Sequence, residues 1–198
     1  CGVPFITAWD ALERSHVQAN TRFLIIGAGA VASAAQALGQ ARGANVVLAT
    51  RRAEVAQALK AQSIKAFQIL DAERLPEQAR DHFQQQLPEV IFDTTGFWLS
   101  AAVNALDSFG RIAVISAPTN GLVNLSALNL YRRGGSIIGT NSLLYSLEDC
   151  ARILKQIGAA FEGGMPAPDD FIELPLSDAV TAYHQVNEGS SRKIVLIP

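Results

Sequence analysis

A glycine-rich turn is the strongest candidate for chemistry in this sequence. The segment Gly27-Ala28-Gly29-Ala30-Val31-Ala32 has the pattern G-x-G-x-x-A and stands between an apolar run and an alanine-rich segment. In a dinucleotide site the first glycine permits a tight turn, the second lets the main chain approach a pyrophosphate, and the third small residue lets helix and strand pack closely. The pyrophosphate then lies at a helix amino end, where N–H groups and the dipole favour an anion. We therefore predict cofactor contacts from Gly27, Ala28, Gly29, Ala30 and Val31.

A similar turn occurs in other folds, so the turn alone does not identify the cofactor. The residues that follow the next apolar run help to identify it. An NAD site carries a carboxylate about 20 residues after the glycines, to hydrogen-bond the ribose hydroxyls. Here that run ends in Thr50-Arg51-Arg52, and no acid appears before Glu54. Arginine binds a 2′-phosphate through paired, charge-assisted hydrogen bonds. We predict NADP as the cofactor, with Thr50, Arg51 and Arg52 near the 2′-phosphate, although one of the arginines is expected only to coat a surface helix.

Two alternatives use the same glycine turn. One is a flavodoxin-like fold with a tight strand-to-helix turn. The other is an S-adenosylmethionine-dependent methyltransferase, which normally carries an acid at the end of the second strand to hold ribose hydroxyls. Thr50-Arg51-Arg52 offers no such acid, which makes the methyltransferase the weaker alternative.

Two further loops follow apolar runs. Thr95 and Gly96 belong to Asp93-Thr94-Thr95-Gly96, and Ser116 and Ala117 precede Pro118. In a doubly wound sheet both loops open at the carboxyl ends of the strands, where the ligand lies. These loops can offer backbone or hydroxyl groups to the nicotinamide half, although glycine and proline are equally common in plain turns.

Other chemistries lack their residues. The three histidines (His16, His82 and His184) lie far apart in the sequence without cysteine or carboxylate at ligand spacing, so we predict no metal site. Neither Tyr131 nor Tyr145 has a lysine four positions on, as the Tyr–Lys pair of short-chain dehydrogenases requires. The sequence therefore lacks the proton-transfer pair of short-chain dehydrogenases.

The elements that must position these residues alternate between strand and helix. Continuous apolar runs separated by helical segments of about ten residues are typical of a parallel sheet covered on both faces. We predict an α/β fold, a doubly wound Rossmann-type parallel sheet of about six strands with flanking helices. The expected strands are 22–26, 46–49, 65–69, 90–93, 111–116 and 136–139, and the expected helices are 7–17, 30–41, 53–61, 77–86, 98–106, 147–157 and 177–187.

Composition limits the class of protein. The 198 residues are 49% hydrophobic and 17% charged, with a net charge of −2, which excludes a disordered chain. The balance of charge lacks the positive excess of a nucleic-acid or membrane-surface binder. No apolar run reaches the ~18–20 residues of a membrane span, and two cysteines form no disulfide framework. We expect a soluble, cytoplasmic protein without nucleic-acid or membrane partners.

Several motifs together resemble one known family. They are Gly2-Val3-Pro4-Phe5-Ile6-Thr7-Ala8-Trp9, the glycine turn, Asp93-Thr94-Thr95-Gly96, Gly134–Gly139 and Lys193-Ile194-Val195-Leu196. On these motifs the whole chain resembles the C-terminal nucleotide-binding domain of a medium-chain dehydrogenase/reductase, of the quinone oxidoreductase (zeta-crystallin) and zinc-type alcohol dehydrogenase-like kind. The turn is nearer to the alcohol dehydrogenase pattern than to the G-x-x-G-x-V-G of quinone reductases.

The resemblance implies an NADPH-dependent enzyme that reduces a quinone, an enone or a related carbonyl compound such as an aldehyde by hydride transfer. It implies that Thr95, Gly96, Ser116 and Ala117 follow the ribose and nicotinamide, and that Ser142, Leu143 and Leu144 flank the nicotinamide. It also implies that two copies pair through the edge strand near 136–145, and that this chain holds no catalytic residue. Val3 stands where zinc-dependent relatives often have a cysteine ligand, which favours the zinc-independent branch. The family's N-terminal catalytic domain has no counterpart in this sequence, so we expect the C-terminal piece of a longer polypeptide.

We accordingly divide the chain into an N-terminal helix at 1–19, an NADP-binding domain at 20–165 and a returning strand-helix-strand at 166–198. The surface that would meet the catalytic domain is expected to expose apolar side chains. The candidates are Phe5, Ile6, Ile172, Ile194 and Leu196. A non-catalytic module that binds or senses NADP(H) remains the alternative function.

Overall fold

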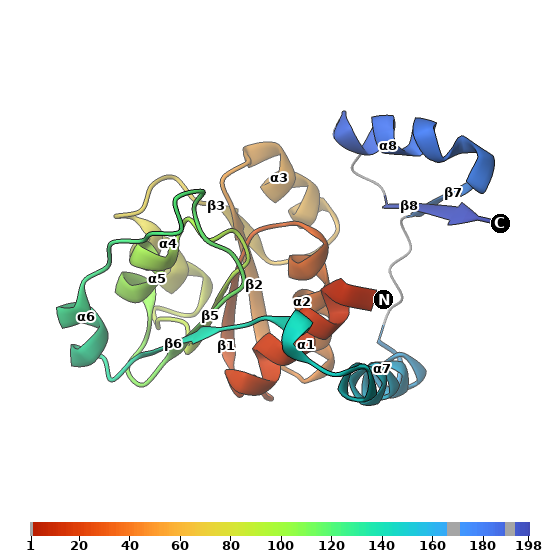
Figure 1. Cartoon of the computed structure of the whole chain (residues 1–198). Helices are drawn as coiled ribbons and strands as arrows, with labels where there is room; N and C mark the ends of the chain where they lie inside the picture. The colour runs from red at the N-terminus through yellow and green to blue at the C-terminus, as the bar shows by residue number, and fades with distance from the viewer. Residues whose placement is uncertain (1, 166–170, 189–192) are drawn as a thin grey trace. The chain divides into compact units, whose positions relative to one another are not determined.

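The computed structural model describes residues 2–165, 171–188 and 193–198. It divides into two compact units, Cys1–Met165 and Pro166–Pro198, and we describe each unit by itself (Figure 1). The first unit contains the glycine turn and every predicted cofactor contact.

A six-stranded sheet forms the centre of the first unit. Its strand order is β3-β2-β1-β4-β5-β6, and every adjacent pair is parallel. The chain adds β2 and β3 on one side of β1 and then returns to place β4, β5 and β6 on the other side. This strand order is that of the doubly wound Rossmann fold and confirms the predicted fold class. The strands are β1 (Arg22–Ile26), β2 (Asn45–Thr50), β3 (Ala66–Gln68), β4 (Val90–Asp93), β5 (Arg111–Val114) and β6 (Ser136–Gly139).

Helices cover both faces of this sheet (Figure 1). The apolar cluster on one face takes side chains from α1, α2 and α7, and the cluster on the other face from α4 and α5. The helices of this unit are α1 (Gly2–Arg14), α2 (Ala30–Ala41), α3 (Ala53–Ala61), α4 (Leu75–His82), α5 (Leu99–Ala105), α6 (Ala127–Arg132) and α7 (Leu147–Glu162), with a short 3₁₀ turn η1 at Ser142–Leu144.

Successive strand residues supply the two apolar clusters in turn. In β1, Phe23 and Ile25 face the first cluster, whereas Leu24 and Ile26 face the second. Leu24 is in register with Val47 of β2 and Ile91 of β4, and all three side chains are fully buried. Both faces of the central strands β1, β2 and β4 are therefore covered by apolar clusters, which is why these strands are mostly continuous apolar runs in the sequence.

The chain leaves the helical conformation earlier than predicted at two helix ends. The first helix was predicted at 7–17 but spans Gly2–Arg14, because His16 takes a left-handed conformation (φ 54°) and Val17 donates back to the Leu12 carbonyl. The helix predicted at 77–86 spans Leu75–His82, because Gln84 and Gln85 have φ of 55° and 65°.

Two other helical segments were missed or predicted too short. Helix α6 was not predicted, and Ser126 begins it by accepting a hydrogen bond from the Asn129 amide at 3.1 Å. Helix α7 was predicted to end at 157 and continues to Glu162.

The expected apolar surface is wrong for two of its five residues. Phe5 and Ile6 are only 3% and 7% exposed. The Phe5 ring packs 5.4 Å from the ring of Phe161 in α7, so α1 belongs to the core of the first unit rather than to an open face. Ile172, Ile194 and Leu196 of the second unit are partly exposed.

The second unit is small. It pairs two parallel strands, β7 (Phe171–Pro175) and β8 (Lys193–Ile197), and connects them through a 3₁₀ turn η2 (Leu176–Asp178) and helix α8 (Ala179–Asn187). Ala182 of α8 is buried, whereas Val180, Tyr183 and Val186 are more than half exposed.

Candidate functional site

The parallel sheet brings the predicted site loops to one edge. Each of these loops directly follows a strand, and parallel strands end at the same edge of a sheet. In open α/β sheets, ligands bind outside the carboxyl ends of the strands, at the point where the strand order reverses. Here that point lies between β1 and β4, and Gly27 follows β1 while Thr94 follows β4.

Gly27 fits tightly against the loop after β4. Its φ is +125°, and a Cβ built on it would come within 2.1 Å of Thr94 Oγ1. The Thr94 hydroxyl and amide both donate to the Ile26 carbonyl, at 2.8 and 3.0 Å, while the Gly27 amide donates to Ala49. Only glycine satisfies both the backbone conformation and the space, so the first glycine of the motif is required by packing.

Gly29 is in a different environment. It is the N-cap of α2 in an extended conformation (φ −88°, ψ −174°), and no side chain caps the helix. A Cβ at Gly29 would meet no atom of the protein within 4 Å. The N–H groups of Ala30, Val31 and Ala32 precede the first intrahelical hydrogen bond, which the Ser33 amide donates to the Gly29 carbonyl at 3.0 Å. Gly29 and Ala30 at this helix end are exposed. The arrangement leaves main-chain donors and the positive end of the helix dipole open to an anion.

Ala32 and Gly39 bring α2 close to the sheet. Ala32 is fully buried, and a Cβ on Gly39 would lie 3.0 Å from Val46 and 3.1 Å from the Phe23 ring. The close approach of helix and strand fixes the position of the turn between them.

The carboxylate of Asp93 organises the loop after β4. Asp93 is fully buried, and its Oδ1 accepts hydrogen bonds from the Thr95 amide (2.9 Å), the Thr95 hydroxyl (2.8 Å) and the Gly96 amide (3.1 Å). Its Oδ2 accepts from the Trp98 amide at 2.9 Å. These four bonds make Asp93 a structural residue of the site, which the sequence pattern alone did not indicate.

The loops after β4 and β5 are in close contact. Gly96 has φ +77°, and a Cβ on it would lie 2.5 Å from the backbone of both Ser116 and Ala117. The structure therefore brings Thr95, Gly96, Ser116 and Ala117 together. Ser116 and Ala117 are exposed.

Arg51 and Arg52 begin the loop after β2, and both are exposed. Among the residues that the structure describes, neither guanidinium takes part in an ion pair. Thr50 is buried and its hydroxyl accepts from the Arg52 amide at 3.3 Å, so Thr50 shapes the loop. The two guanidinium groups are thus left available to an anion.

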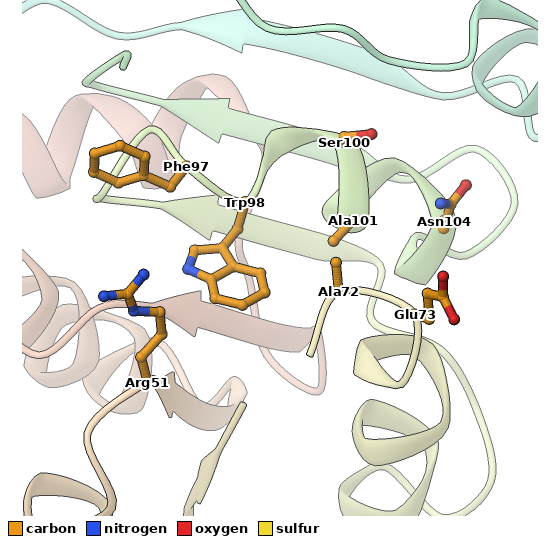
Figure 2. Close-up of a pocket in the computed structure, with 8 residues that line it drawn as sticks. All are labelled: Arg51, Ala72, Glu73, Phe97, Trp98, Ser100, Ala101 and Asn104. Atoms are coloured by element: carbon orange, nitrogen blue, oxygen red, sulfur yellow. The ribbon is translucent and has the colours of Figure 1, made fainter. Parts of the chain in front are cut away.

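A pocket of about 350 Å³ lies next to Arg51. Figure 2 shows Arg51 reaching from the end of β2 toward the indole ring of Trp98, with Glu73 and Asn104 on the opposite side. Trp98 was interpreted as a packing residue, and Phe97, which is 66% exposed, was not selected. Phe97 and Trp98 lie between the end of β4 and the start of α5. This position at the carboxyl end of a strand is the sequence signal that could have identified both as candidate site residues.

The segment predicted to flank the nicotinamide forms η1. Leu143 and Leu144 are each 83% exposed, while Ser142 lies 2.8 Å from Thr7 of α1 through their hydroxyl oxygens. No hydrogen bond in the described part of the chain joins Ser142, Leu143 or Leu144 to the glycine turn.

Zinc ligands are not found together in the described ranges. Residues 2–165, 171–188 and 193–198 contain no group of three or more His, Cys, Asp or Glu side chains placed to hold a metal ion. These residues therefore do not fit a zinc site. In the same ranges, no helix has both the length and the apolar character needed to cross a membrane.

The strand order and the glycine turn between β1 and α2 define a Rossmann-type nucleotide-binding domain. Residues 30–160 match the family model described as zinc-binding dehydrogenase, so the chain belongs to this family of the medium-chain dehydrogenase/reductase superfamily. The match confirms the predicted resemblance, and the chain corresponds to the C-terminal nucleotide-binding part of its relatives.

Three known proteins illustrate the relationship. The zinc-type alcohol dehydrogenase-like protein C337.11 of Schizosaccharomyces pombe is 32% identical over 203 residues, covering 98% of this chain and 58% of that protein. An alcohol dehydrogenase superfamily protein from Novosphingobium aromaticivorans superposes with a TM-score of 0.78 at 24% identity, over 96% of this chain and 59% of that one.

The third protein is the quinone oxidoreductase from Thermus thermophilus, whose structures include a complex with NADPH. It gives a TM-score of 0.70 at 21% identity, over all of this chain and 64% of that one. At these identities the two solved structures show a shared fold. This chain spans about three fifths of the length of each of the three relatives.

Proposed function

We propose that this chain is the NADP(H)-binding part of an oxidoreductase that reduces a quinone, an enone or a related carbonyl compound. The observation that carries the proposal is the pair of exposed arginines, Arg51 and Arg52, at the end of β2. Neither has an acidic partner in the described part of the chain, and no acid stands at the position that reads a ribose diol.

The chain's own residues fit the phosphates of such a coenzyme. The open main chain at Ala28–Val31 would hold the pyrophosphate, because the space over Gly29 is empty of protein atoms. Arg51 and Arg52 would bind the 2′-phosphate by charge-assisted hydrogen bonds. The pocket beside Arg51 has room for the adenine base against Trp98.

The nicotinamide half would follow the loops after β4, β5 and β6. Thr95, Gly96, Ser116 and Ala117 form one wall, and Ser142, Leu143 and Leu144 form another. The bound coenzyme supplies the hydride. The protein's part in this chain is to bind and orient it, and the exposed Leu143 and Leu144 would keep water from its ring.

The rest of the activity is inferred from relatives. Reduction of a quinone is proposed because the Thermus thermophilus relative is a quinone oxidoreductase. Zinc independence is proposed because Val3 occupies the position of a cysteine ligand in zinc-dependent relatives. The cytoplasm is the proposed location.

Calorimetric titration of the chain with NADPH, NADH and S-adenosylmethionine tests the cofactor assignment. We expect NADPH to bind with a dissociation constant in the micromolar range and NADH to bind at least about tenfold more weakly, because NADH lacks the phosphate. S-adenosylmethionine should give no heat above dilution. Equal affinities for the two coenzymes would refute the phosphate assignment, and binding of S-adenosylmethionine alone would favour the methyltransferase.

We also propose that two copies of the chain pair through β6. Among the described strands, β6 is at the edge of the sheet with β5 as its one neighbour. It is followed by Leu143, Leu144 and Leu147, which are 83%, 83% and 90% exposed. Sedimentation velocity over a range of concentrations should show a species of twice 21.1 kDa. A Leu147→Lys variant should have a higher dissociation constant for the pair of chains than the parent, so its dimer should separate into single chains at concentrations where the parent is still paired. A 21.1 kDa species at every concentration would contradict the pairing.

A further inference from the structure

Three polar contacts join helix α1 to the end of β6 and the segment that follows it, although the paired residues are at least 125 positions apart in the sequence. The α1 residues stand three and four positions apart, so their side chains share one face of the helix. The contacts join Thr7 Oγ1 to Ser142 Oγ (2.8 Å), Tyr145 Oη to Asp10 Oδ1 (2.5 Å), and Arg14 Nη1 to the Gly139 carbonyl (2.5 Å). Figure 1 shows η1 lying against α1.

The central contact is between Asp10 and Tyr145. Asp10 is only 2% exposed, and its second oxygen lies 3.8 Å from the Arg14 guanidinium. The Tyr145 hydroxyl donates to the carboxylate, and this hydrogen bond, together with burial, raises the pKa of Tyr145 to about 12. Tyr145 therefore remains a hydrogen-bond donor at all physiological pH values.

The leucines of η1 have little packing of their own. Leu143 and Leu144 are both 83% exposed, so apolar burial does not fix their positions. Within the turn, Asn141 Oδ1 accepts from the Leu143 amide at 3.1 Å. The residues on either side of the two leucines, Ser142 and Tyr145, are the ones held by α1. Polar contacts on both flanks thus determine where the leucines lie.

We infer that Asp10 and Tyr145 are positioning residues for the nicotinamide end of the cofactor. They act through η1, because Tyr145 directly follows this turn and Asp10 accepts its hydroxyl hydrogen bond. The inference rests on the proposed function, in which Leu143 and Leu144 flank the nicotinamide ring. A segment that is already ordered does not have to be immobilised when the coenzyme binds, so the contact should increase affinity for the complete coenzyme.

Two ligands separate positioning from general stability. NADPH carries both halves of the coenzyme, whereas adenosine 2′,5′-bisphosphate has the adenosine and 2′-phosphate but no nicotinamide. Tyr145→Phe should raise the dissociation constant for NADPH about five- to tenfold and leave that for the bisphosphate within about twofold. The fluorescence emission of the bound reduced nicotinamide should also shift toward that of free NADPH.

Variants of Asp10 and a matched tyrosine control complete the test. Asp10→Asn keeps an oxygen acceptor for Tyr145 and should retain most of the NADPH affinity, whereas Asp10→Ala should lose at least as much as Tyr145→Phe. Tyr131→Phe removes a hydroxyl from an exposed side chain of α6 and should change neither dissociation constant. Tyr145→Phe keeps the ring, so it tests the hydrogen bond even if Asp10→Ala fails to fold.

The outcomes distinguish this inference from the proposed function. If the parent chain binds neither ligand, the proposed function fails and the inference fails with it. If the parent binds both, but Tyr145→Phe leaves NADPH affinity unchanged or weakens both ligands equally, only the positioning role is refuted.

Discussion

Replacing Arg51 and Arg52 together by alanine should raise the dissociation constant for NADPH by about ten- to a hundredfold while leaving that for NADH within about twofold. A hydrogen bond to a charged group is typically worth about 1.5–3 kcal/mol, and about 1.4 kcal/mol corresponds to a factor of ten. Because both side chains are exposed, solvent screening reduces each contribution, which keeps the expected effect at or below a hundredfold. Calorimetric titration of the two coenzymes measures both constants.

The single variants assign the phosphate contact. Arg51 lines the pocket beside Trp98, so Arg51→Ala should account for the larger share of the loss. Arg80→Ala removes one positive charge from an exposed position in α4 and controls for the change in overall charge. An Arg51→Ala/Arg52→Ala chain that still prefers NADPH over NADH by the parent's ratio would contradict the assignment.

The parts of the fold that depend on neighbouring residues were predictable from the sequence. The run of residues 23–26 is apolar because both faces of β1 are covered, and Gly27 ends it where the backbone takes φ +125°. Strand and turn can therefore be recognised from the order of residue types alone. The six-strand Rossmann sheet follows from repeating this pattern.

Features that depend on residues far apart in the sequence have no local sequence pattern by which to predict them. Asp10 and Tyr145 are separated by 135 positions, and neither has a neighbour that indicates the other. Helix α6 is six residues long with no buried side chain, so it lacks the apolar periodicity by which helices are recognised. The burial of Phe5 depends on Phe161, which comes from a helix near the end of the first unit.

The candidate site shows the same division. The glycine turn and the arginines were identified because their chemistry lies in consecutive residues. The pocket beside Arg51 combines residues from the loops after β2, β3 and β4 and from α5, so only the assembled sheet shows it. Asp93 was quoted as part of a loop, but its four hydrogen bonds became evident only with the backbone in place.

The second large effect is expected at Gly29. Gly29→Ala should weaken NADPH binding by about tenfold or more while changing the free energy of unfolding by less than about 1 kcal/mol. The new methyl group meets no protein atom within 4 Å, and φ −88° is open to alanine, so the fold can accept it. The same methyl group would occupy the space through which a pyrophosphate approaches the main chain. Calorimetric titration and urea denaturation measure the two quantities separately.

Two other glycines make the test specific. Gly27→Ala should lower the free energy of unfolding by at least about 2 kcal/mol, because φ +125° and the Thr94 hydroxyl both exclude a side chain. Gly158→Ala adds a methyl group to open space on α7 and should stabilise the chain by up to about 1 kcal/mol without affecting NADPH. A plain strand-to-helix turn needs glycine only at position 27. A Gly29→Ala chain that binds NADPH as tightly as the parent would therefore reduce the motif to a folding element and remove the pyrophosphate site.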